Sequence, residues 1–268
     1  MKPHLTNQLQ TLGLLTILVL QAGLVGWLLA GTVGVGFALT MGAIFAAGAS
    51  RMPAWAALRM LGARPVGPWQ APWLHRVVET LSRRASLPRV PRLALIESPD
   101  LNALTVGSPD EPVVAVTRGL LQSLPEREII GVLAHEVSHI AHRDLRTLAL
   151  AQSFASITSR MGPLGLFLTP LGLLFGAPQL TLVGLVLLAG PALAQLLTLA
   201  VSRTREFAAD QLAAEITGDP QALATALRRI EATGTRRARR FGVMPREVPV
   251  WLRSHPPTSD RVRRLAAT

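Results

Sequence analysis

The chain has 268 residues, an apolar share of 49%, a formal net charge of +11 and no cysteine. This length allows one or two ordinary domains with a sizeable core. The lack of cysteine excludes a disulfide framework, a cysteine-ligated metal site and a thiol nucleophile.

The apolar residues are concentrated in two long segments. Residues 3–50 and 161–202 contain no Asp, Glu, Lys or Arg, which makes charge-free stretches of 48 and 42 residues. A bilayer core about 30 Å thick takes roughly 20 apolar residues per helix, so each stretch has room for two spans. We therefore predict a membrane protein with about four transmembrane helices in two hairpins.

In the first hairpin we expect helices from about Leu9 to Leu29 and from about Val33 to Ala49, with a turn at residues 30–32. A signal peptide is the competing interpretation, but it has a short apolar core and a basic beginning. One early lysine followed by two long apolar runs favours a retained hairpin.

The second hairpin is expected over residues 163–176 and 180–201, and glycines and prolines interrupt it (Gly165, Pro170, Gly172, Pro191). Broken helices are stable in lipid only where neighbouring protein satisfies the freed backbone groups. A second interpretation therefore stays open, in which this hairpin enters the bilayer shallowly or packs against the polar part of the chain.

The basic residues indicate an orientation. Apart from Lys2 they are all arginines, and these lie within residues 51–160 or 203–268. The positive-inside rule then places both termini and both polar segments in the cytoplasm, and we expect a multi-pass protein of the inner membrane.

The arginine cluster at residues 236–240 is not accompanied by a nucleic-acid-reading module. We therefore expect this cluster to attract anionic lipid head groups of the bilayer and to bind no nucleic acid.

The chain thus divides into an N-terminal hairpin (1–50), a first polar part (51–160), a second hairpin (161–202) and a second polar part (203–268). Spacing in the first polar part predicts a helix and three strands, at Trp73–Ala85, Arg92–Glu97, Asn102–Gly107 and Val113–Val116. Another helix begins near Thr117. In the second polar part we expect a helix from residue 202 towards Ile216, one from Gln221 to roughly Thr233, and a short one ending at Leu265.

A His-Glu-x-x-His motif lies in a predicted helix from about Glu126 to His142, with Ser123 as its N-cap. Residues i and i+4 share one helix face, so His135 and His139 can bind the same metal ion. Glu136 then lies where it can deprotonate a water molecule at that ion. We expect His142, three residues further on, to lie at the surface or to support a ligand.

A catalytic zinc site needs a third protein ligand. Glu206 begins an otherwise apolar helix face, and Asp210 follows one turn later. Glu206 could bind the metal while Asp210 accepts the remaining N–H of a ligand histidine. Alternatively, the two form a solvated charge pair beside Arg203 and Arg205. The spacing alone leaves both interpretations open.

Several further motifs carry a resemblance to a known family. They are Asn102-Ala103-Leu104, Thr117-Arg118-Gly119-Leu120-Leu121, the Ala134–His142 segment, the Ser202–Asp210 segment, Thr217-Gly218-Asp219-Pro220 and Ser254-His255-Pro256-Pro257. Together they resemble the HtpX-type membrane metallopeptidases, a family that includes the CAAX prenyl proteases. One departure is Leu104, where the family often has phenylalanine.

The resemblance implies an α+β zincin domain of the gluzincin type, mostly helical with a small sheet. It also implies one Zn²⁺ per chain with Glu206 as the third ligand, and an endopeptidase that acts on membrane proteins, often misfolded ones, in quality control under stress. Protein or peptide substrates and the lipid bilayer are the expected partners.

The remaining roles follow from this chemistry. Glu136 accepts the proton of the attacking water, and His255 is a candidate donor to the oxyanion, with a structural cap as its alternative. Asn102 and Ala103 could hold substrate backbone beside an edge strand, or Asn102 could simply cap a turn.

Charges that flank the His-Glu-x-x-His motif make an intramembrane active site costly. A membrane scaffold or chaperone with a structural metal site is the non-enzymatic alternative, but such a site has no use for Glu136.

Overall fold

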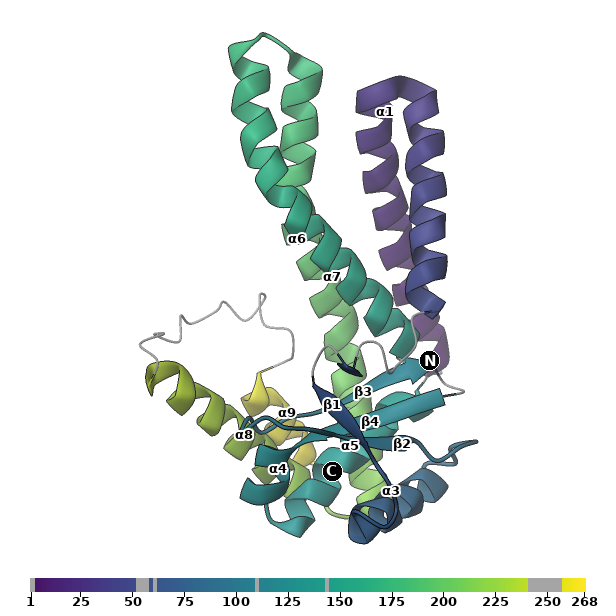
Figure 1. Ribbon diagram of the computed structural model, residues 1–268, viewed down its shortest axis with the longest axis vertical. Helices are drawn as coiled ribbons and strands as arrows, with labels where there is room; N and C mark the ends of the chain where they lie inside the picture. Colours follow the sequence, from purple (N-terminus) through teal and green to yellow (C-terminus); the bar gives the residue numbers. More distant parts are fainter. Residues whose placement is uncertain (1–2, 52–57, 60–61, 109–110, 143–144, 241–256) are drawn as a thin grey trace. The chain divides into compact units, whose positions relative to one another are not determined.

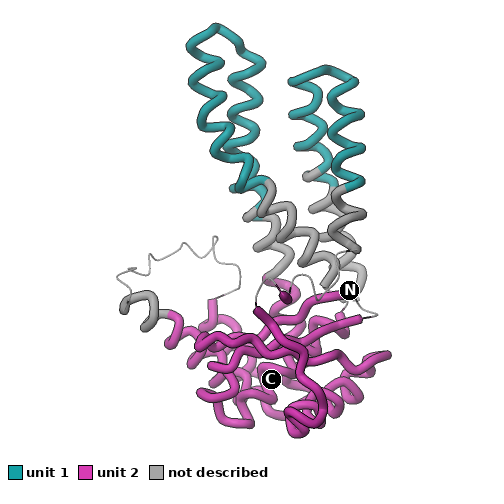
Figure 2. The backbone as a smooth tube through the Cα atoms, viewed as in Figure 1, with its two compact units in different colours: residues 1–51, 147–202 teal, residues 52–146, 203–268 magenta. Residues whose placement is uncertain are grey.

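The computed structural model describes residues 3–51, 58–59, 62–108, 111–142, 145–240 and 257–268. The chain forms two compact units, each assembled from two stretches of sequence (Figure 2). Unit 1 comprises residues 1–51 and 147–202, and unit 2 comprises residues 52–146 and 203–268.

Helix α1, Pro3–Arg51, reverses its direction part-way. Ala30 and Gly31 have non-helical backbone angles, and the φ of 58° at Gly31 lies in the region that glycine adopts without a steric penalty. Figure 1 shows the two arms of α1 running antiparallel on either side of this point. The turn expected at residues 30–32 is therefore present.

Helices α6, Leu145–Leu174, and α7, Pro178–Thr217, form a second hairpin (Figure 1). Residues 147–202 of this hairpin belong to unit 1, and residues 203–217 of α7 belong to unit 2. The prediction that its glycines and prolines interrupt it is wrong, because both helices continue through them. Three of the glycines are contact points between the helices: a Cβ at Gly165 would lie 2.5 Å from the carbonyl oxygen of Gly184, and one at Gly172 would be equally close to the backbone nitrogen of Thr181. Small residues at such positions let two helix backbones approach closely.

One helix in the described part of the chain is long and apolar enough to cross a membrane, at Val19–Ile44 with a mean hydropathy of 1.8. This segment includes the reversal at Ala30 and Gly31, so it consists of parts of two arms. The apolar part of α7, Pro178–Ala194, is shorter. Four transmembrane helices therefore stay a prediction. Both hairpins expose large apolar side chains, among them Leu20, Trp27, Val33, Phe37, Leu166, Phe167, Leu174 and Phe175.

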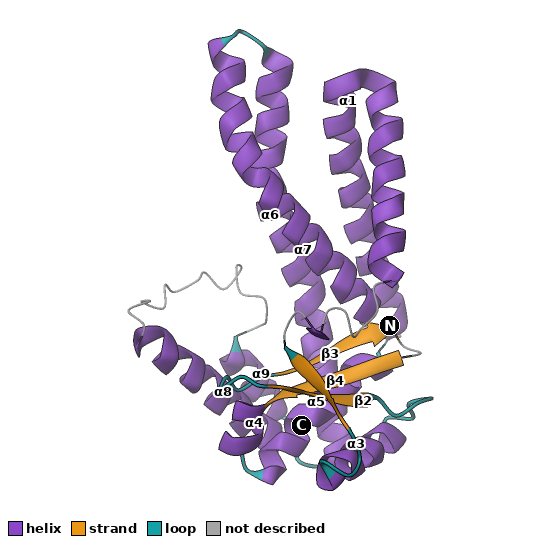
Figure 3. Cartoon of the chain, in the orientation of Figure 1, coloured by secondary structure: helices purple, strands orange, loops and turns teal. Residues whose placement is uncertain are grey.

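Unit 2 contains a four-stranded sheet (Figure 3) formed by β1 (Ala63–Val66), β2 (Arg92–Ile96), β3 (Ala103–Ser108) and β4 (Glu111–Thr117). The strand order is β1-β2-β4-β3, with β2 and β4 parallel and the other neighbours antiparallel. The three predicted strands are present, and β1 was not expected. Strand β3 lies at one edge of the sheet.

Both faces of the sheet are covered, and residues of β4 alternate between them. Val114 and Val116 pack in the main core, which also holds side chains of helices α3 (Pro72–Arg84), α5 (Glu126–Ala141), α8 (Pro220–Arg240) and α9 (Thr258–Leu265). Val113 and Ala115 pack on the other face in a smaller cluster with Leu58. A central strand buried on both faces reads as a continuous apolar run, as Val113–Val116 does.

Helix α5 is the centre of unit 2 and is buried on almost every side. It packs against α3, α8 and the sheet. A Cβ at Gly131 would lie 2.9 Å from the backbone nitrogen of Leu223 in α8, so glycine permits this close approach. The predicted N-cap is wrong: Ser123 is the last residue of the short helix α4 (Arg118–Ser123), and α5 begins after Pro125 without a side-chain cap.

Candidate active site

Helix α5 buries both histidines and the glutamate of its motif, with exposed fractions of 8% for His135, 9% for Glu136 and 7% for His139. One helical turn separates the histidines, and their Nε2 atoms lie 3.1 Å apart. The two rings meet edge to face at an interplanar angle of 84°. Two imidazole nitrogens therefore converge on one point.

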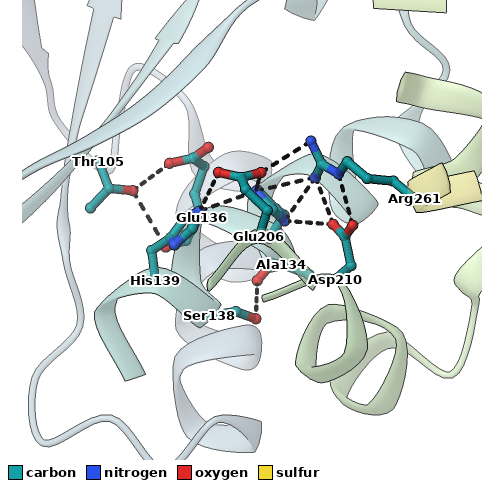
Figure 4. A network of polar contacts seen from close by, with 9 residues as sticks. Thr105, Ala134, Glu136, Ser138, His139, Glu206, Asp210 and Arg261 are labelled. Carbon is teal, nitrogen blue, oxygen red and sulfur yellow. Dashed lines mark hydrogen bonds and ion pairs between the residues drawn. The ribbon is translucent and has the colours of Figure 1, made fainter. Parts of the chain in front are cut away.

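Glu206 of α7 completes this cluster (Figure 4). Its Oε2 lies 3.4 Å from Nε2 of His135, and its Oε1 lies 3.7 Å from Nε2 of His139. Glu206 and Asp210 are each only 3% exposed. The alternative in which these carboxylates form a solvated charge pair is therefore wrong.

The spacing of these three side chains fits a single metal ion. Ligand atoms that surround zinc tetrahedrally at about 2.0–2.1 Å are separated from one another by about 3.3 Å. The observed separations of 3.1, 3.4 and 3.7 Å lie around this value. Two imidazoles and one carboxylate are also a donor set typical of zinc enzymes in which one position is left for the reaction.

Asp210, one turn beyond Glu206 on α7, contacts the other side of a histidine ring: its Oδ1 lies 2.9 Å from Nδ1 of His135. Burial and Arg261 lower the pKa of His135, but hydrogen bonds to Asp210 and Glu206 outweigh them and raise this pKa to about 9. Burial would raise the pKa of Asp210, but hydrogen bonds from Arg261 and His135 lower it overall.

Arg261 of α9 lies across both carboxylates and was not found from the sequence. Its Nε and one terminal nitrogen donate to the two oxygens of Asp210 at 2.7 and 2.6 Å, and the other terminal nitrogen lies 3.1 Å from Oε2 of Glu206. Arg261 is only 6% exposed. A planar guanidinium suits this bidentate geometry. No local pattern marks Arg261, because its partners are about 50 residues away in sequence.

Glu136 points its carboxylate towards the edge strand, where the Thr105 hydroxyl donates to its Oε2 at 2.7 Å (Figure 4). Thr105 was also not found from the sequence, although the alternation of β3 contained the signal. Leu104 and Val106 pack on the far face of the sheet, which leaves Thr105 on the face of α5.

The remaining predicted residues lie as follows. The side chain of Asn102 is exposed, and its backbone N–H donates to Oγ1 of Thr117 at 3.0 Å just before β3. Ala103 begins β3 and pairs with Val116. His142 is the half-buried C-cap of α5. His255 lies outside the described residues.

Comparison with known proteins agrees with this geometry. The sequence profile of peptidase family M48 matches residues 68–268. This chain belongs to peptidase family M48. It is 37% identical to a "Protease HtpX homolog" of Acaryochloris marina over 97% of this chain and 94% of that protein. A homologue of the same name from Salinibacter ruber is 34% identical over 97% of both chains.

Among solved structures, the fold resembles the crystal structure of S. mikatae Ste24p with a TM-score of 0.54. The sequence identity is 18%, so this likeness shows the fold alone. The match covers 97% of this chain and 65% of that one. Membership of peptidase family M48 and the possible metal site of His135, His139 and Glu206 make the chain a metallopeptidase, as the sequence predicted. The scaffold alternative is not favoured.

Proposed function

We propose that this metallopeptidase is a membrane-anchored zinc endopeptidase that hydrolyses peptide bonds of membrane proteins, misfolded ones included, at a cytoplasmic active site. The observation that carries the proposal is the convergence of His135, His139 and Glu206 within 4.8 Å, with Glu136 beside them. In this assignment the first three residues hold the metal, and Asp210 fixes the orientation of the His135 ring.

When bound, zinc would supply a Lewis acid that polarises the scissile carbonyl and makes water acidic enough to react near neutral pH. Glu136 accepts a proton from the attacking water at its carboxylate as the water oxygen bonds to the carbonyl carbon. Glu136 then gives this proton to the amine nitrogen as the C–N bond breaks. The buried position of Glu136 keeps bulk water from competing for this proton.

Edge strand β3 supports an extended substrate. It pairs with β4 on one side, and no described strand pairs with its other side. A substrate segment can add there as a further strand through backbone hydrogen bonds, with Asn102 and Ala103 at its beginning. His255 is the proposed oxyanion donor, because the reaction needs a donor besides the metal and the two prolines that follow His255 in the sequence would restrict its backbone.

The anchoring rests on the two hairpins of unit 1. Both expose large apolar side chains such as Trp27, Phe37 and Phe167. Exposed apolar surface of this extent is costly in water and favourable in lipid. Reporter fusions at Gly31 and Ala177 test the topology: both turns should report the side opposite the cytoplasm, and a cytoplasmic signal at either turn would reject that hairpin as a span.

The enzymatic part is tested by Glu136→Gln, which keeps the size of the side chain and removes the base. We expect proteolysis of casein and of an unfolded membrane protein to fall by about 10²–10⁴-fold, while the bound metal is retained. Glu126→Gln is the matched control, because Glu126 is exposed on the same helix. Undiminished cleavage by Glu136→Gln would overturn the mechanism, and a zinc-loaded but inert wild type would overturn the function.

A further inference from the structure

The hydroxyl group of Thr105 contacts Glu136 and no other described side chain by hydrogen bonding. Oγ1 lies 2.7 Å from Oε2 of the carboxylate and 3.4 Å from the backbone oxygen of the same residue. A hydroxyl has one proton to donate, and the shorter contact to a charged acceptor is the stronger hydrogen bond. The Thr105 proton therefore goes to the carboxylate of Glu136.

The position of Thr105 in the sheet makes this contact specific. Thr105 lies in the middle of edge strand β3, opposite Val114 of β4. On β3, Leu104 and Val106 pack into the apolar cluster on one face, while Ala103 and Thr105 are on the face that meets α5. An apolar β-branched residue would suit this half-buried position equally well, so packing alone does not require the hydroxyl.

We propose that Thr105 is a positioning residue for the general base: its hydroxyl holds Oε2 of Glu136 in place, so that Oε1 faces the reacting water. The proposal rests on the proposed function, in which Glu136 is that base. A glutamate carboxylate has a broad preference about its last torsion angle, so without a donor it samples many orientations. One hydrogen bond from a rigid strand removes most of this freedom.

The same strand would also present its free edge to the substrate. The residue that orients the base and the backbone that aligns the peptide are then parts of one strand, so the relative position of the two reactants is fixed within β3. Small displacements between reacting groups cost rate much more than they cost binding. Loss of the hydroxyl is therefore expected to lower kcat and to leave KM nearly unchanged.

The test uses the full-length, zinc-loaded protein in detergent micelles and compares Thr105→Val with Thr105→Ser. Valine has the shape of threonine without the donor, and serine keeps the donor without the methyl group. We expect kcat on a fluorogenic peptide to fall about tenfold in Thr105→Val, with KM within about twofold of wild type, and serine to restore most of kcat. Thr105→Ala makes the same comparison in a smaller side chain if the valine variant does not fold.

Two readouts besides activity separate positioning from a structural role. Metal content and the thermal unfolding of the metal-free protein should be unchanged in Thr105→Val. The affinity for a simple hydroxamate, whose hydroxyl is recognised by the base, should fall about tenfold when measured by calorimetry. A structural role would instead lower stability or metal content, and would affect valine and serine alike.

A wild-type kcat and hydroxamate affinity in Thr105→Val, or an equal loss in Thr105→Ser, would overturn the inference. Failure of the proposed function looks different: the wild type would bind the hydroxamate and cleave nothing. In that case the hydroxamate affinities of the two variants still decide whether Thr105 positions Glu136.

Discussion

Oδ1 of Asp210 lies 2.9 Å from Nδ1 of His135, while Nε2 of the same ring faces His139. The carboxylate therefore contacts the ring at the atom that does not face the proposed metal position. Such a contact fixes the tautomer of the imidazole and increases its basicity. The two residues lie on different helices, α5 and α7, so the contact also fixes one helix against the other at the site.

Asp210→Asn should weaken metal binding by about 10–100-fold, because the amide is a poorer acceptor for the His135 N–H. Competition with a chelator of known affinity measures this effect. Glu215→Gln, at an exposed position of the same helix, is the control and should bind metal as the wild type does. Equal metal affinities for the three proteins would mean that Asp210 has no part in the site.

Arg261→Met should destabilise the metal-free protein by about 3–5 kcal/mol, because it removes the buried guanidinium that contacts the buried carboxylates of Asp210 and Glu206. Denaturant titration measures the free energy of unfolding. Arg263→Met removes an exposed arginine from the same helix and should change the free energy of unfolding by less than about 0.5 kcal/mol. If the two variants were equally stable, the ion pairs of Arg261 would not matter for folding.

Metal binding should depend steeply on pH. The pKa of His135 is raised from 6.5 to about 9 in the metal-free protein, so a metal ion must displace a proton from this ring at neutral pH. Apparent metal affinity should therefore rise about tenfold per pH unit up to about pH 9 and level off above it. The stability of the metal-free protein depends on pH in the opposite direction. The stability that protonated His135 contributes is complete below about pH 6.5 and is lost as the pH rises through about 9. An affinity that stays constant between pH 6 and 8 would contradict the assignment.

Gly131→Ala should destabilise the protein although alanine favours helices. Alanine gains about 1 kcal/mol over glycine within a helix, but the new Cβ would lie 2.9 Å from the backbone of Leu223, and such overpacking typically costs about 1–3 kcal/mol. Gly234→Ala in α8 is the matched control, since among the described residues no atom beyond its chain neighbours and its own helix backbone lies within 4 Å of the added Cβ. We expect the first variant to lower the unfolding temperature and the second to raise it slightly; the reverse order would refute the close approach of α5 and α8.

The sequence predicted those parts of the fold that local patterns specify. Alternation and apolar runs indicated β2, β3 and β4, and the motif spacing placed two histidines and Glu136 on α5. Strand β1 was missed because its four residues include Pro65, and only pairing with β2 makes them a strand. The expected end of a helix near Val201 was also wrong, since α7 continues to Thr217.

The site was predicted where residues are close in sequence and missed where they are far apart. Glu206 and Asp210 share a helix face, but spacing could not decide between a buried and a solvated pair, because burial depends on what packs against that face. Arg261 and Thr105 reach the site from α9 and β3, and only the folded chain brings them to it. A buried arginine gives no periodic signal in the sequence. The sheet face on which Thr105 lies, in contrast, follows from the alternation of residues along its strand.

A metal-loaded structure with anomalous scattering collected at the zinc edge tests the central claim most directly. We predict one ion per chain, with Nε2 of His135, Nε2 of His139 and a carboxylate oxygen of Glu206 within about 2.0–2.2 Å of it. An ion bound elsewhere, or one at this position with Glu206 turned away from it, would contradict the account.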